Sequence, residues 1–376
     1  MSRHAYDVAI VGAGIVGAAC ARECARAGLS VAVIESHHLA YGATSAAMGH
    51  LAVMDDSEAQ FALTRYSLRL WDELAEEAPA DCGVDRCGCI WIAADEDDLT
   101  ELRRKRTFYQ DRGVAVEVLD AAALREAEPR LHPGLVGGLL VPGDSVIYPP
   151  CAARFLIEQA RAAGAQLFLG RSVTSLTGAA VGLADNESIA ARFTINAAGA
   201  WAPTLTPGIE VLRRKGHLVI TDRYPGFARH QLIELGYLKS AHAIGTDSVA
   251  CNIQPRSTGQ LLIGSSRQLG VESPEADLSV VRAMIRRACE YMPGLAELSA
   301  IRVWTGFRPA TPDNLPLIGP SPAQENVYLA TGHEGLGITT SLATARLVTD
   351  QLLKRPSEIP VAPYLPNRTG QEARYA

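Results

Sequence analysis

The stretch DVAIVGAGIVG at residues 7–17 decides the fold, together with Glu35, which follows 18 residues later. It reads as a strand, a glycine turn and a helix, and a second apolar strand then leads to the acid. Gly12 allows a tight turn, Gly14 lets a pyrophosphate approach, and Gly17 lets the helix pack closely on the sheet. The helix N-terminus offers N–H groups to phosphates, and Glu35 stands where an acid meets a ribose hydroxyl. The pattern predicts a dinucleotide site; NAD and FAD both fit it, and an ordinary glycine-rich turn is the alternative.

Composition narrows the class of protein. The chain has 376 residues, enough for two or three domains, with 48% hydrophobic and 20% charged residues, as in ordinary globular enzymes. With a net charge of −6 and no basic arm, we expect no nucleic-acid partner. The first strand begins by Asp7, which leaves no room for a signal peptide, and no apolar run is long enough for a transmembrane segment. We expect a cytoplasmic protein, associated with a membrane only through partners.

Two groups of residues have ordinary structural interpretations. Cys20 and Cys24 lie on one face of the first helix and are expected in the core, whereas residues 82–89 hold three cysteines without a fourth ligand. We therefore expect reduced thiols and no metal. The basic run at residues 103–106 is expected to be a solvated helix face, with a docking patch for another subunit as the alternative.

The order of segments predicts an α/β fold of two domains. Helices are expected at 57–77, 151–163 and 335–353, and strands at 90–93, 166–169, 192–196 and 327–331. Period-2 segments within 211–300 favour an antiparallel sheet. We expect a Rossmann-like nucleotide domain of the GR2 type made from residues 1–80, 145–210 and 301–376. A second, α+β substrate domain on an antiparallel sheet would comprise residues 81–144 and 211–300.

Further motifs follow the first in a specific order. They are GATS at 42–45, a strand that ends in NAAGAW at 196–201, GFRPATPDN at 306–314 and GHEGLG at 332–337. Each one alone is generic. Together with the opening motif they resemble the D-amino-acid oxidase family of FAD enzymes over nearly the whole chain, from Asp7 to about Leu353. MGHL at 48–51 and HEGLGITTSL at 333–342 resemble the branch of D-hydroxyproline dehydrogenases and the flavin subunit of hydrogen cyanide synthase.

The resemblance implies FAD as cofactor and a set of residues that bind it. The opening motif and its acid contribute Gly12, Gly14, Ile15, Val16, Gly17, Glu35 and Ser36. The middle of the chain contributes Thr44, Ser45, Val173, Ala198, Gly199 and Trp201. The start of the last helix contributes Gly335, Leu336, Gly337, Ile338 and Thr339, whose N–H groups would stabilise an anionic reduced flavin.

The resemblance also implies the reaction, which is hydride transfer from the carbon beside an amine to the flavin. Arg308 is expected to grip the substrate carboxylate through two charge-assisted hydrogen bonds; a structural salt bridge is the alternative. His50 is a second catalytic and substrate-binding candidate, and His333 is a substrate-binding candidate. Asn252 stands where glycine-oxidase-like relatives tend to carry an aromatic hydroxyl. We hypothesise that it binds a polar substrate group such as the hydroxyl of hydroxyproline; an exposed polar strand face is the alternative.

Three functions compete on this basis. The favoured one is an FAD-dependent dehydrogenase of a small cyclic or secondary D-amino acid, D-hydroxyproline above all. The alternatives are a glycine or D-amino-acid oxidase that uses oxygen, and a flavin electron-transfer subunit of a multi-subunit dehydrogenase. Partners for the dehydrogenase would be an iron–sulfur protein, a second flavoprotein or a quinone.

Overall fold

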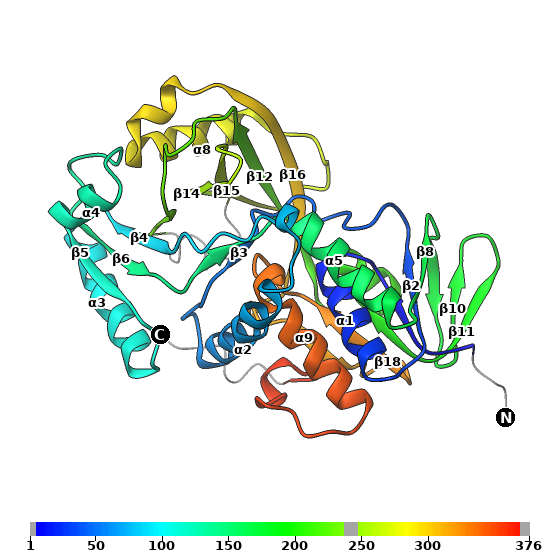
Figure 1. The fold of residues 1–376 in the computed structure, drawn as a ribbon. Helices are drawn as coiled ribbons and strands as arrows, with labels where there is room; N and C mark the ends of the chain where they lie inside the picture. The colour runs from blue at the N-terminus through cyan, green and yellow to red at the C-terminus, as the bar shows by residue number, and fades with distance from the viewer. Residues whose placement is uncertain (1–4, 237–246, 369–376) are drawn as a thin grey trace.

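The computed structural model describes residues 5–236 and 247–368, and two large sheets organise them (Figure 1). In the first sheet, β18, β11, β1, β2 and β8 run parallel and β17 is antiparallel at the edge. Its strands are β17 (Leu317–Pro320), β18 (Val327–Thr331), β11 (Ser188–Asn196), β1 (Tyr6–Val11), β2 (Val31–Glu35) and β8 (Gln166–Leu169), with β9 (Val173–Leu176) and β10 (Ala180–Leu183) joined through β11.

The second sheet is mixed. Its strands, in spatial order, are β16 (Ala300–Ala310), β12 (Leu212–Thr221), β15 (Leu261–Leu269), β14 (Ser248–Pro255), β13 (Gln231–Glu234), β4 (Cys89–Ala93), β6 (Gly137–Val141) and β5 (Glu117–Asp120). Neighbours are antiparallel except β13 and β4, which run parallel. A small pair, β3 (His50–Leu51) and β7 (Ser145–Val146), stands apart from both sheets.

Helices of different lengths connect the strands of the two sheets. They are α1 (Ile15–Arg26), α2 (Glu58–Ala75), α3 (Glu96–Asp111), α4 (Ala121–Ala127), α5 (Pro149–Ala162), α6 (Ala202–Leu205), α8 (Leu278–Tyr291) and α9 (Gly337–Leu352). Short 3-10 helices occur at Ala80–Cys82, Gly199–Trp201, Pro293–Glu297 and Ala362–Tyr364. The predicted helices and strands are confirmed, most with ends shifted by a residue or two; α9, for example, begins at Gly337 rather than at 335. The exception is β11, which begins at Ser188 rather than at 192.

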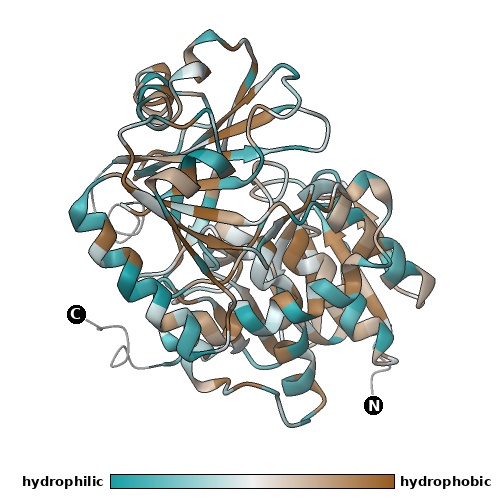
Figure 2. Cartoon of the chain, turned by 60° about the vertical axis from the view of Figure 1, so that its left-hand side comes forward, coloured by the Kyte–Doolittle hydropathy of each residue, from teal (hydrophilic) through white to brown (hydrophobic). Residues whose placement is uncertain are grey.

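Alternation along β1 explains the layers of the first sheet. Val8 and Ile10 point into a core shared with α1, α2, α5 and α9, whereas Ala9 and Val11 point into a second core with β9 and β10. Cys20 and Cys24 are buried in the helical core, as predicted. In Figure 2 the hydrophobic colour gathers on the strands and on inward helix faces, in agreement with this layering.

The second sheet is covered by α8 on one face. Ile90 and Ile92 of β4 lie in the same hydrophobic core as this helix, while Trp91 points to the opposite face, toward α3. The strand that carries Arg308, β16, pairs along most of its length with β12. The strand pairing therefore groups residues 300–310 with the second sheet, although the division predicted from the sequence places residues from 301 onward with the nucleotide domain.

The basic run at residues 103–106 is only partly a solvated face. Arg103, Arg104 and Arg106 are exposed, but Lys105 is fully buried and ion-paired with Asp55. Its ammonium nitrogen also lies 3.8 Å from the centre of the Trp91 ring. The prediction is wrong for Lys105 because α3 turns one face toward the second sheet, and the position on that face is buried whatever residue occupies it.

Candidate functional site

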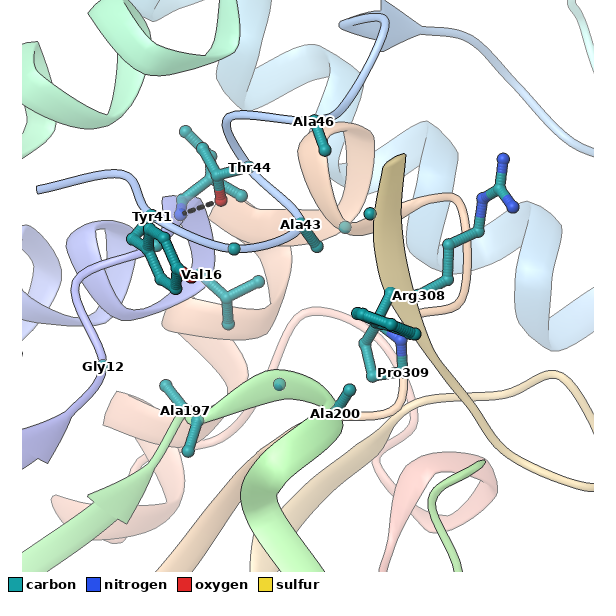
Figure 3. Close-up of a pocket in the computed structure, with 18 of the residues that line it drawn as sticks. Gly12, Val16, Tyr41, Ala43, Thr44, Ala46, Ala197, Ala200, Arg308 and Pro309 are labelled. Atoms are coloured by element: carbon teal, nitrogen blue, oxygen red, sulfur yellow. Dashed lines mark hydrogen bonds between the residues drawn. The ribbon is translucent and has the colours of Figure 1, made fainter. Parts of the chain in front are cut away.

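A cavity of about 670 Å³ receives residues from both sheets. One end is lined by the glycine turn after β1, Glu35 and the end of β11. The other end is lined by β12, β14, β15 and β16 together with the loop before α9. Figure 3 shows this span, with Thr44 and Val16 on one side and Arg308 on the other. The cavity therefore joins the dinucleotide turn to residues of the second sheet, as a site for a dinucleotide and a small substrate requires.

Close backbone packing at the glycine turn explains why two of its positions, Gly12 and Gly17, are glycine. Gly12 has φ +103°, and a Cβ there would lie 2.6 Å from the Ala197 carbonyl oxygen. A Cβ on Gly17 would overlap the Gly12 carbonyl, so the first turn of α1 packs directly on the end of β1. Any larger residue would push α1 away from the sheet and distort the cradle.

Glu35 and Thr44 hold the turn from both sides. One Glu35 carboxylate oxygen accepts a hydrogen bond from the Ala13 N–H at 2.8 Å, and the other accepts one from the His37 N–H at 3.0 Å. The Thr44 hydroxyl accepts one from the Ile15 N–H at 2.9 Å, drawn as a dashed line in Figure 3. The GATS loop thus packs against the N-terminus of α1, at the phosphate end of a dinucleotide site.

Most residues predicted to bind the cofactor line the cavity. These are Gly12, Gly14, Ile15, Val16, Glu35, Ser36, Thr44, Val173, Ala198, Gly199, Trp201, Gly335, Gly337 and Ile338. Gly17, Ser45, Leu336 and Thr339 are not among the lining residues. Ser45 is exposed and its hydroxyl donates to the Gly42 carbonyl, whereas the Thr339 hydroxyl donates to the His50 carbonyl at 2.9 Å. Thr339 thereby supports the strand that carries His50.

Arg308 lies at the end of the cavity opposite the glycine turn. Its guanidinium group crosses Gly216 of the neighbouring strand, where a Cβ would lie 2.7 Å from the Arg308 Cζ. Arg308 Nη1 donates to the Ser266 carbonyl at 2.9 Å. The side chain is therefore held by two adjacent strands, a placement suited to a group that must grip a carboxylate in one orientation.

Glu334 gathers three arginines beside this point. Its Oε1 lies 3.5 Å from Arg214 Nη1 and 3.4 Å from Arg267 Nε. Burial raises the pKa of this carboxyl, but Arg267, Arg308 and Arg214 outweigh burial and lower the pKa of Glu334 to about 2. Three guanidinium groups thus lie near one carboxylate in a largely buried corner, a setting that favours the binding of an anion.

Three polar atoms of the same end are buried and have no hydrogen-bond partner among the described residues. They are His50 Nε2, Asn252 Oδ1 and Ser265 Oγ, and all three side chains line the cavity. Burial lowers the pKa of His50 to about 4, so its imidazole is neutral at physiological pH. Buried polar atoms normally have partners, so these three indicate a polar ligand.

Asn252 is not on an exposed strand face. Its side chain is buried in β14, and its neighbour on the same face, Gln254, donates to the Met48 carbonyl at 3.0 Å.

His333 also lines the cavity, but its Nε2 lies 3.0 Å from the Thr344 hydroxyl, and burial lowers the pKa of His333 to about 3. A role for His333 in substrate binding stays a prediction.

Several lining residues escaped the sequence analysis. Gly216 and Ser265 reach the cavity from segments without a recognised motif. Glu334 lies within the quoted motif at 332–337, but no role is predicted for it from the sequence. Arg171 and Ser172 approach the dinucleotide end from the turn after β8. Period-2 strands show which residues share a face, but not which face meets the cavity.

Within the described ranges, no three His, Cys, Asp or Glu side chains are grouped so that they could hold a metal ion. Among the helices that the structure describes, none combines the length and apolar character needed to cross a membrane.

Comparison with known proteins identifies the family to which this site belongs. A model described as "FAD dependent oxidoreductase" (DAO) matches residues 7–351. The chain is 30% identical to a glycine oxidase of Geobacillus kaustophilus, over 96% of each chain. It is 27% identical to hydrogen cyanide synthase subunit HcnC of Pseudomonas aeruginosa, again over 96% of each.

A solved structure agrees with this match. The crystal structure of glycine oxidase from Geobacillus kaustophilus superimposes with a TM-score of 0.88, at 30% identity, and covers 98% of this chain and 100% of that one. The predicted fold, with an FAD-binding Rossmann-like unit, is confirmed.

Proposed function

The chain belongs to the DAO family of FAD-dependent oxidoreductases, which act on carbon–nitrogen bonds of amino acids, and we propose that its substrate is a small cyclic or secondary D-amino acid, with D-hydroxyproline favoured. One observation carries the proposal. Polar atoms without partners among the described residues lie at the Arg308 end of the cavity, beyond what a carboxylate alone would need. A substrate with both a carboxylate and a further hydrogen-bonding group fits that end.

The cofactor fits the residues present. The close-packed glycine turn, the Ile15 N–H held by Thr44 and the carboxylate of Glu35 form the expected cradle, and the loop before α9 lines the other end of the same cavity. When bound, FAD supplies the hydride acceptor: the substrate carbon beside nitrogen loses a hydride, the nitrogen loses a proton, and an imine results.

Each protein residue then has a proposed part. Arg308 binds the substrate carboxylate and fixes the position of the carbon that reacts. Neutral His50 accepts a hydrogen bond from the substrate amine through Nε2 and orients it. Asn252 Oδ1 accepts a hydrogen bond from a second donor, such as a ring hydroxyl. A site of this kind discriminates strongly against analogues that lack the group.

Anaerobic bleaching of the flavin tests this proposal directly. The purified protein would be mixed with D- and L-amino acids, including both hydroxyproline epimers, D-proline, sarcosine and glycine. We expect the fastest bleaching with D-hydroxyproline. Faster bleaching by glycine than by any cyclic amino acid would contradict the proposed substrate class.

The identity to a glycine oxidase favours a second candidate, an oxidase that passes electrons to oxygen. Aerobic turnover separates the two, because an oxidase forms one peroxide for each imine whereas a dehydrogenase needs another acceptor.

The match to a hydrogen cyanide synthase subunit favours a third candidate, a flavin subunit that works with electron-accepting partners. Turnover of the isolated chain with an artificial acceptor would show whether it oxidises a substrate by itself.

A further inference from the structure

Glu334 occupies a loop position that is costly to maintain. It lies between β18 and α9 and has φ +47°, a left-handed conformation that residues other than glycine rarely adopt. Its N–H donates to the Pro309 carbonyl at 2.7 Å, and the neighbouring His333 forms an isolated antiparallel bridge with Ala310. The loop is thus attached to β16 directly after Arg308.

The Glu334 side chain connects the loop to two further strands, β12 and β15. One carboxylate oxygen accepts a hydrogen bond from the Gly335 N–H, and the other lies between Arg214 and Arg267. Gly335 follows Glu334 in the turn before α9 and lines the cavity, and a Cβ there would lie 3.8 Å from Arg308 Nε. The carboxylate therefore lies between the arginine cluster and the backbone of that turn.

Charge explains why a carboxylate is needed there. Arg214 and Arg308 are directly paired residues of β12 and β16, and like charges in such a pair repel. The side chain of Glu334 is only 12% exposed, so water screens this repulsion weakly. An ionised Glu334 offsets it and holds the guanidinium groups in place.

We propose that Glu334 is a positioning residue, which sets where Arg308 holds the substrate carboxylate relative to the turn at Gly335–Ile338. This inference rests on the proposed role of Arg308 in carboxylate binding. A misplacement of Arg308 by about 1 Å would cost up to about a hundredfold in rate.

The variants Glu334→Gln and Glu334→Asp separate charge from reach. Gln keeps an acceptor for the Gly335 N–H but removes the negative charge; Asp keeps the charge on a shorter side chain. For Glu334→Gln we expect kcat per bound FAD to fall tenfold or more, while acetate and benzoate bind as tightly as in the wild type or more tightly. For Glu334→Asp we expect a smaller fall in kcat and unchanged carboxylate affinity. Carboxylate binding would be followed by flavin absorbance and by thermal shift.

Glu272→Gln is the matched control. Glu272 also lies 3.5 Å from an arginine, Arg213, but its side chain is 81% exposed and lies away from the cavity, so kcat and carboxylate binding should not change. A wild-type kcat per bound FAD in Glu334→Gln would overturn the inference, as would a loss of activity that merely follows loss of FAD. If Glu334→Gln does not fold, a wild-type kcat in Glu334→Asp overturns it.

The proposed function fails in a different way. Wild-type protein that binds no carboxylate and bleaches with no amino acid would contradict the proposed function, whatever the Glu334 variants do.

Discussion

The guanidinium group of Arg308 lies directly over the α-carbon of Gly216, so that a single added methyl would lie 2.7 Å from its Cζ. We expect Gly216→Ala to displace Arg308 and to raise the KM for the amino acid about tenfold or more, with FAD content unchanged. Steady-state kinetics and the flavin-to-protein absorbance ratio would measure both. Gly143→Ala is the control, because no atom lies within 4 Å of a Cβ there and the position has no positive φ. An unchanged KM would show that Arg308 does not bind substrate in this orientation.

Arg308→Lys keeps the charge but loses the planar pair of donors. Charge-assisted hydrogen bonds contribute about 1.5–3 kcal/mol, so we expect KM to rise by about tenfold to a hundredfold. The measurement is the KM for the amino acid under conditions where the acceptor saturates. The alternative, a purely structural salt bridge, predicts lower thermal stability and an unaltered KM.

Asn252 is expected to select for a polar substituent on the substrate. In Asn252→Ala, the ratio of hydroxyproline to proline turnover should fall about tenfold or more, because only hydroxyproline loses a hydrogen bond. The readout is kcat/KM for both amino acids. Gln110→Ala, an amide removed from the exposed end of α3, is the control. The hypothesis fails if the ratio stays as in the wild type.

Thr44 and Ser45 are adjacent hydroxyl residues with different expected effects on the cofactor. Thr44→Val removes the acceptor of the Ile15 N–H, so FAD should dissociate about fivefold more readily, in line with a hydrogen bond of about 1 kcal/mol. Ser45→Ala should retain FAD, because Ser45 is exposed and its hydroxyl bonds the Gly42 carbonyl. Titration of the apoprotein with FAD gives both dissociation constants. Equal weakening in the two variants would contradict this assignment.

Asp144 is expected to make stability fall as pH rises. Burial raises the pKa of this carboxyl to about 8, although the Val53 N–H and Lys105 oppose the shift. The folded state then holds a proton that the unfolded state releases, so between about pH 4 and 8 the free energy of unfolding decreases by up to about 1.4 kcal/mol per pH unit.

Asp144→Asn mimics the protonated form and should remove this decline. We expect it to match the wild type near pH 4 and to be more stable near pH 8, as measured by urea unfolding across that range. Asp111→Asn, at the exposed end of α3, serves as control and should follow the wild-type curve. A parallel decline in Asp144→Asn would show that Asp144 is ionised in the folded protein.

The local patterns were sufficient for much of the fold. The glycine turn, the strands at 166–169 and 327–331 and the helix after Ser57 depend on short-range rules, namely glycine at positions of close approach, apolar runs in strands and apolar residues at helical spacing. The structure adds that the Ser57 side chain caps α2, where its hydroxyl oxygen accepts a hydrogen bond from the Gln60 N–H. The same rules could not show that Lys105 is buried, because burial depends on what packs against a helix face.

The sequence by itself determined the dinucleotide turn, which depends on adjacent residues, and the family, which depends on short motifs in a fixed order along the chain. It also singled out Arg308 as a candidate for substrate binding. Tertiary structure alone decided the surroundings of Arg308. Gly216, Ser266 and Glu334 come from three distant segments, and only strand pairing and the attachment of the Glu334 loop to β16 bring them together. No local sequence pattern predicts this strand register, because it follows from long-range packing and from the balance of buried charges.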